Sequence, residues 1–124
     1  MPKTFQDLVA DAKTRVREIS VDEVRRLDAG GAALIVDIRE ESEWARGHLP
    51  AATHVGRGVL ELKLPQLVPD LDVPLVLYCG GGNRSALAAD ILQQMGYTDV
   101  RSMAGGWRAW TAAGGPVASE ASTR

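Results

Sequence analysis

One stretch of the chain, Leu75–Ser85 (LVLYCGGGNRS), joins a short apolar run to the only cysteine, three glycines, an asparagine and an arginine. The apolar run predicts a buried strand, and the segment Ala86–Met95 carries apolar residues at the spacing of one helix face. Gly96 stands where a residue in the left-handed conformation would end that helix. The pattern therefore predicts a strand, a tight turn and a helix, with the Cys79 thiol at the end of the strand.

The predicted turn has the chemistry of an anion-binding site. Glycine adopts positive φ angles without steric cost, so Gly80, Gly81 and Gly82 allow successive backbone N–H groups to turn inward. The helix that follows adds unpaired N–H groups and the positive end of its dipole, and Arg84 adds a permanent cation. Such surroundings favour the thiolate form of a cysteine. We therefore expect Cys79 to be a nucleophile rather than a buried structural cysteine.

The segment Cys79–Ser85 resembles the active-site loop of the rhodanese-like sulfurtransferases, in which the cysteine carries a persulfide and four residues separate it from the arginine. Thiol phosphatases of the cell-cycle dual-specificity type share this general fold, but their loop has one more residue between cysteine and arginine. The shorter spacing favours sulfur over phosphorus as the electrophile. The resemblance implies that Cys79 is the catalytic residue and that the other loop residues bind substrate, namely Gly80, Gly81, Gly82, Asn83, Arg84 and Ser85.

A second segment, Asp37–Ala52, is similar to a signature found upstream in rhodanese-like domains, D-x-R-x-x-x-E-[F/W]-x-x-G-H-[I/L]-P-x-A. Trp44 in this segment is expected to anchor the core. Histidine is a common general base, which makes His48 a candidate for that role. A thiolate held by backbone N–H groups needs no base, however, so we expect His48 to have a structural role. Three charged residues are spaced to pair with one another and predict a structural ion-pair network: Asp37, Arg39 and Glu43.

A third segment, Gly105–Trp110, is similar to the G-G-[W/x]-x-x-W ending of rhodanese-like domains. Trp107 and Trp110 are three residues apart on a predicted helix and are expected to close the core. In the family, the region around Arg57 lies close to the active-site mouth. The resemblance therefore implies that Arg57 helps to attract an anionic sulfur donor, although a solvated loop arginine explains the residue equally well.

Helical and strand patterns alternate along the chain, which is typical of a parallel sheet covered by helices on both faces. A first helix is expected over residues 4–17. A second helix begins at the capping box of Ser20 and Glu23 and ends at Gly30–Gly31. The prolines of residues 65–74 predict an irregular connection. Strands are expected over three further short runs, residues 33–37, 53–55 and 99–103.

The resemblance extends over residues 18–113 and implies a three-layer α/β/α fold with a central, mostly parallel, five-stranded sheet. It divides the chain into an N-terminal helical extension, a rhodanese-like domain and a flexible C-terminal tail, which are residues 1–17, 18–116 and 117–124.

The composition is that of a soluble globular protein of one domain, with 124 residues, 45% hydrophobic and 24% charged. A net charge of −2 gives no support for nucleic-acid binding, and no apolar run reaches membrane-spanning length. One cysteine cannot form an internal disulfide, which favours a reducing compartment. We expect a cytoplasmic protein without a metal ion or cofactor; the sequence favours no particular oligomeric state.

The residues and the resemblance together predict a sulfurtransferase of the thiosulfate:cyanide type (rhodanese). Its donor would be a small anionic sulfur compound, thiosulfate or a persulfide, and its acceptor a thiol or cyanide. One alternative is a thiol phosphatase or arsenate reductase, which the loop length and the single cysteine disfavour. Another is a non-enzymatic or partner-specific rhodanese-like module that carries sulfur or binds a protein.

Overall fold

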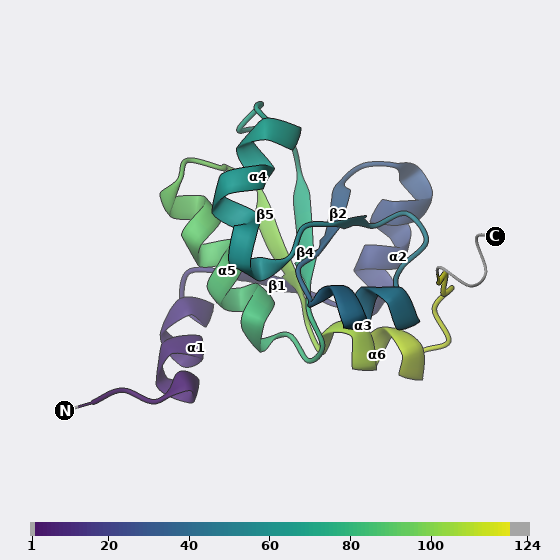
Figure 1. Ribbon diagram of the computed structural model, residues 1–124, viewed down its shortest axis with the longest axis horizontal. Coiled ribbons are helices and arrows are strands. Elements are labelled where there is room, and N and C mark those ends of the chain that lie inside the picture. Colours follow the sequence, from purple (N-terminus) through teal and green to yellow (C-terminus); the bar gives the residue numbers. More distant parts are fainter. Residues whose placement is uncertain (1, 120–124) are drawn as a thin grey trace.

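The computed structural model describes residues 2–119, which form one five-stranded sheet with helices on both faces (Figure 1). The strand order is β1-β5-β4-β2-β3, and every neighbouring pair is parallel. The strands are β1 (Arg17–Ile19), β2 (Leu34–Asp37), β3 (Thr53–His54), β4 (Leu75–Tyr78) and β5 (Val100–Met103). The helices are α1 (Phe5–Lys13), α2 (Val21–Gly30), α3 (Glu41–Arg46), α4 (Leu60–Leu67), α5 (Asn83–Gln94) and α6 (Gly106–Ala112). The predicted three-layer α/β/α architecture is confirmed.

The core consists of two apolar layers, one on each face of the sheet. Strand β4 lies at its centre, and its side chains alternate, so that Leu75 and Leu77 enter one layer while Val76 and Tyr78 enter the other. Buried residues of α4 and α5 complete the first layer, and buried residues of α2 and α6 complete the second. Because parallel strands end at the same edge, the carboxyl end of β4 is where ligands bind in such sheets.

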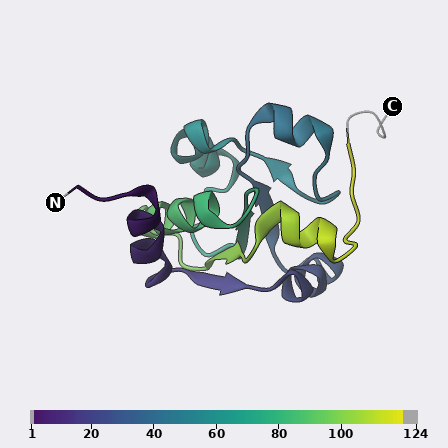
Figure 2. The same cartoon turned by 90° about the horizontal axis from the view of Figure 1, so that it is seen from below.

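Helix α1 packs against α5, at the flank of the sheet (Figures 1 and 2). Val9 and Ala12 are buried in this contact, and the predicted capping box of Thr4 and Asp7 is present. The predicted helix was too long, because it ends at Lys13 and the chain then forms the edge strand β1. Only Ile19 of that strand is buried, and pairing with β5 rather than a local apolar pattern stabilises it.

Two predicted helix ends are confirmed. Gly31 has φ +63° and closes α2, and Gly96 has φ +107° just after α5. The Glu23 backbone N–H donates to Ser20 Oγ at 3.1 Å at the start of α2. Among residues 2–119, no helix is long and apolar enough to cross a membrane.

The connection before β4 is more helical than predicted. Helix α4 continues through Pro65 to Leu67, so the expected irregular segment begins later. A proline inside a helix removes one backbone hydrogen bond. The buried side chains of Leu60 and Leu64 hold the helix against the core and offset that loss.

The C-terminal segment is anchored where a flexible tail was predicted. His48 and Ala118 exchange two backbone hydrogen bonds of 2.9 Å, and Trp110 Nε1 donates to the Pro116 carbonyl at 2.8 Å. The two bonds with Ala118 satisfy the backbone N–H and carbonyl groups of the buried residue His48. The rest of the predicted tail, residues 120–124, lies outside the described residues.

Candidate active site

The Cys79 thiol lies directly after β4 and is surrounded by the loop that leads into α5. Its Sγ accepts hydrogen bonds from the backbone N–H groups of Gly82, at 3.2 Å, and Ser85, at 3.3 Å. The thiol donates to Ser85 Oγ at 3.5 Å. The residue as a whole is only 1% exposed. These donors stabilise negative charge on sulfur, because a thiolate is a better acceptor than a thiol.

The loop is held in this shape by buried contacts beneath the thiol. Gly82 adopts φ +98° and precedes the first turn of α5, and a Cβ there would lie 3.1 Å from the Gly105 nitrogen. Ser85 is fully buried; its Oγ donates to the Gly82 carbonyl at 3.3 Å and lies 2.8 Å from Ser102 Oγ. Gly82 and Ser85 therefore shape the loop from below rather than from the pocket wall.

The N-terminus of α6 fixes the other side of the loop. The Trp107 N–H donates to the Cys79 carbonyl at 2.8 Å, and the Arg108 N–H donates to the Gly80 carbonyl at 3.1 Å. Gly106 has φ +54°, and a Cβ at this position would collide with the Cys79 carbonyl oxygen. The first backbone N–H groups of α6 thus bind the loop carbonyls, while the N–H groups of Gly82 and Ser85 bind Sγ. Sequence reasoning missed this contact, although the Gly105-Gly106 pair was a signal of close backbone approach.

Arg84 is held by an ion pair with Glu43 of α3. Its two terminal nitrogens lie 3.0 and 3.1 Å from the two carboxylate oxygens. The hydrogen bond with Arg84 lowers the pKa of Glu43 from 4.5 to about 2, and the same bond raises the pKa of Arg84. The ion-pair prediction is confirmed for Asp37 and Arg39, whose shortest contact is 2.7 Å, but wrong for Glu43.

This ion pair predicts a pH effect on stability. A carboxyl group whose pKa is lowered on folding stabilises the protein when ionised, and the stabilisation is lost as the pH falls from 4.5 towards 2. We expect Glu43→Gln to lower the free energy of unfolding at neutral pH, and the difference from wild type to shrink across that acidic range. Urea titrations of both proteins at several pH values measure this difference in the free energy of unfolding. A difference that stays constant with pH would contradict the assignment.

A cavity of about 350 Å³ opens above Sγ. Five residues predicted for the site line it, namely Cys79, Gly80, Gly81, Asn83 and Arg84. Four further lining residues come from other elements and were not predicted for the site, namely Phe5, Glu43, Trp107 and Arg108. Arg108 is exposed and takes part in no ion pair within residues 2–119, so the pocket has a second cation beside Arg84.

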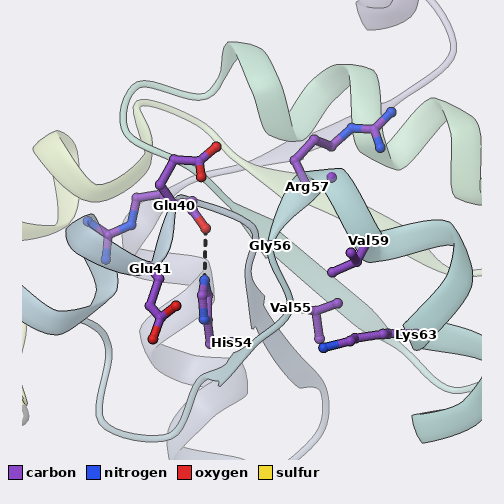
Figure 3. A pocket seen from close by; sticks show the side chains of 10 residues that line it. Glu40, Glu41, His54, Val55, Gly56, Arg57, Val59 and Lys63 are labelled. Atoms are coloured by element: carbon purple, nitrogen blue, oxygen red, sulfur yellow. Dashed lines mark hydrogen bonds between the residues drawn. The ribbon is translucent and has the colours of Figure 1, made fainter.

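Arg57 lies in a different pocket. It pairs with Glu61 at 2.6 Å and lines a cavity of about 470 Å³ together with residues of α3, β3 and α4. Figure 3 shows its side chain directed away from His54 and Glu41, which line the same cavity. The structure does not bring Arg57 to the pocket of Cys79.

Trp44 and His48 form a stack outside the two core layers. Their ring centroids are 3.4 Å apart, and Trp44 also stacks on His54 at 5.1 Å. The prediction that Trp44 anchors the core is wrong, because its partners are imidazoles and the side chain is half-buried. His48 Nδ1 lies 2.8 Å from the Leu49 carbonyl, as expected for a structural turn residue.

Within the described part of the chain, no cluster of three or more His, Cys, Asp or Glu side chains could hold a metal ion.

Comparisons with known proteins agree with this geometry. The rhodanese-like domain family matches residues 20–113. The thiosulfate sulfurtransferase GlpE of Pseudomonas aeruginosa strain PAO1 is 36% identical over 94 residues, which cover 76% of this chain and 83% of that protein. The human single-domain sulfurtransferase TSTD1 has a TM-score of 0.72 and 31% identity, covering 78% of this chain and 96% of that one.

A further solved structure is similar over a longer part of the chain. It is the protein of unknown function RPA3614 of Rhodopseudomonas palustris, described as a possible tyrosine phosphatase. The TM-score is 0.86 at 35% identity, and the match covers 95% of this chain and 99% of that one. The rhodanese-like domain family thus matches most of this chain, and the cysteine loop of the predicted form lies at the end of the central strand. The chain belongs to the rhodanese-like sulfurtransferase family.

Proposed function

We propose that the protein transfers sulfane sulfur from thiosulfate, or a related anionic donor, to cyanide or a thiol through a persulfide on Cys79. The observation that carries the proposal is the position of Sγ. It accepts hydrogen bonds from two backbone N–H groups at the base of a pocket that also contains Arg84 and Arg108. Such a site attracts an anion and stabilises a sulfur nucleophile.

The first step loads the cysteine. The Cys79 thiolate attacks the outer sulfur of thiosulfate and forms a new S–S bond. The original S–S bond of the donor breaks, and sulfite leaves with its electron pair. The N–H groups of Gly82 and Ser85 lie within 3.3 Å of Sγ and stabilise its charge before attack. The cationic guanidinium groups of Arg84 and Arg108 offset the charge of the donor and of the sulfite that departs.

The second step transfers the outer sulfur from Cys79 to the acceptor. An acceptor thiolate or cyanide attacks the outer sulfur of the persulfide, and Cys79 leaves as a thiolate. Two covalent half-reactions predict ping-pong kinetics.

Because both oxygens of Glu43 pair with Arg84, the arginine braces the loop throughout the cycle while its exposed surface faces the pocket. We also infer a cytoplasmic location, since a reducing compartment keeps a lone reactive cysteine in its thiol form.

The test is the intact mass of the purified protein after brief thiosulfate treatment. We expect a gain of one sulfur atom, which later addition of cyanide removes with formation of thiocyanate. A protein that gains no sulfur from thiosulfate, and none from a cysteine-desulfurase persulfide, would contradict the proposal and favour a binding module.

The similarity to a possible tyrosine phosphatase gives a second activity to measure. Four residues separate Cys79 from Arg84, a spacing that favours sulfur over phosphate. We therefore expect para-nitrophenyl phosphate hydrolysis no faster with wild type than with Cys79→Ser. Hydrolysis that depends on Cys79 would favour the phosphatase instead.

A further inference from the structure

Helix α1 contributes a residue to the lining of the active-site pocket. The family match begins at residue 20, so α1 lies outside it. Phe5, the first residue of α1, nevertheless lines the same cavity as Cys79. Figure 2 shows α1 beside the helix that follows the cysteine loop, α5. The pocket therefore has an apolar wall that the matched segment does not supply.

The helix that carries Phe5 is firmly attached to the domain. Val9 and Ala12 are buried against α5. Beyond the helix end, Arg15 donates to both carboxylate oxygens of Asp90 at 3.0 and 2.8 Å, and Gln93 Nε2 donates to the Arg15 carbonyl at 3.1 Å. Asp90 belongs to α5 and is 8% exposed. These contacts hold Phe5 at a defined place beside the cysteine loop.

Trp107 supplies a second aromatic ring to the pocket, and this residue is also held in place by defined contacts. The Trp107 backbone N–H is bonded to the Cys79 carbonyl, and the Arg39 guanidinium lies 4.7 Å from the centroid of the Trp107 ring. Phe5, by contrast, is 48% exposed. The two rings and the two arginines give the pocket apolar and cationic surfaces together.

Thiosulfate has no apolar group that could pack against the aromatic residues of this pocket. It is a small polar anion, which the N–H groups and arginines recognise but which gains nothing from an aromatic wall. A cavity of about 350 Å³ falls within the roughly 300–1,000 Å³ that organic ligands occupy. An apolar group on the donor would cover the exposed ring of Phe5, and aromatic pairs stabilise beyond the burial of their area.

We propose that Phe5 selects sulfur donors whose leaving group carries an apolar substituent, which extends the sulfurtransferase function proposed above and rests on it. With an organic thiosulfonate, the Cys79 thiolate attacks the outer sulfur, the S–S bond of the donor breaks, and the sulfinate leaves with the electron pair. The reaction yields the same persulfide as thiosulfate does. Only the leaving group differs, and it is the part that contacts the aromatic wall.

The experiment compares two donors, benzenethiosulfonate and methanethiosulfonate, which share their reactive group and charge and differ in the ring. In a ping-pong reaction, kcat/KM for the donor reports the loading step alone. We measure it with cyanide as acceptor. For Phe5→Ala we expect the ratio of kcat/KM for benzenethiosulfonate to that for methanethiosulfonate to fall about tenfold from the wild-type ratio. Phe5→Tyr, which keeps a ring, is expected to retain the wild-type ratio.

Leu8→Ala is the matched control. Leu8 lies on the same helix and is similarly exposed, at 46%, but does not line the cavity. We expect it to leave the ratio unchanged. A ratio within twofold of wild type in Phe5→Ala would overturn the proposal, as would an equal fall in Leu8→Ala, which would indicate a general effect of α1. If wild type forms no persulfide with either donor or with thiosulfate, the sulfurtransferase function itself fails, and the selectivity fails with it.

Discussion

Replacing Cys79 by serine is expected to lower sulfurtransferase turnover by at least about a thousandfold, the order of loss seen when a covalent nucleophile is removed. A hydroxyl at this position still accepts the hydrogen bonds that Gly82 and Ser85 donate to Sγ. It has neither the acidity nor the nucleophilicity of a thiol, so no persulfide forms. Cyanide-dependent thiocyanate production measures the loss, and the intact mass shows whether sulfur is bound.

The thermal stability of the Cys79→Ser protein is the control for this experiment. Serine is close in size to cysteine and lies at a fully hydrogen-bonded site, so we expect thermal unfolding close to that of wild type. A normally folded Cys79→Ser protein that still turned over thiosulfate would contradict the mechanism, because the described residues contain no other cysteine. An inactive protein with wild-type stability assigns the loss to chemistry alone.

The strand, turn and helix around Cys79 are predictable because local chemistry determines them. The apolar run of β4 is buried on both sides, and glycine is required where Gly82 and Gly96 adopt positive φ. The alternation of strand and helix patterns likewise predicts the parallel sheet. None of these inferences needs a contact between segments that are distant in the sequence.

The pocket walls depend on such distant contacts, and for that reason the sequence does not reveal them. Phe5 and Arg108 reach the cavity only because α1 packs on α5 and α6 begins against the loop. Glu43 is close in sequence to Asp37 and Arg39, but α3 directs its carboxylate to Arg84 instead. Spacing along the chain identified the charged residues and assigned one of them the wrong partner.

The edge strand β1 shows a second reason for error. Two of its three residues are exposed, so the segment has no apolar pattern of its own, and its pairing with β5 creates the strand. Arg57 illustrates the opposite case. The family resemblance assigned it to the active-site mouth, whereas Arg57 pairs with Glu61 and lines a different cavity from that of Cys79.

Gly106→Ala is expected to be the most damaging glycine substitution near the site, with a loss of about 3 kcal/mol or more in the free energy of unfolding. Two penalties combine at this position. The residue has φ +54°, which costs an L-residue about 1–2 kcal/mol, and its new Cβ would collide with the Cys79 carbonyl oxygen. Relief of the collision moves α6 away from the loop and breaks the hydrogen bond from Trp107 to that carbonyl. Sulfur transfer should therefore fall together with stability.

Gly31→Ala separates the two penalties. Gly31 also has a left-handed conformation, with φ +63°, but a Cβ at this position would meet no heavy atom within 4 Å beyond its own chain neighbours. The variant should lose only the conformational term, about 1–2 kcal/mol, and should keep its activity because Gly31 closes α2 and does not line the cavity of Cys79. Urea unfolding followed by tryptophan fluorescence gives both values. Equal destabilisation by the two substitutions would contradict the close approach of α6 to Cys79, and with it the argument that α6 positions the loop carbonyls so that the N–H groups can bind sulfur.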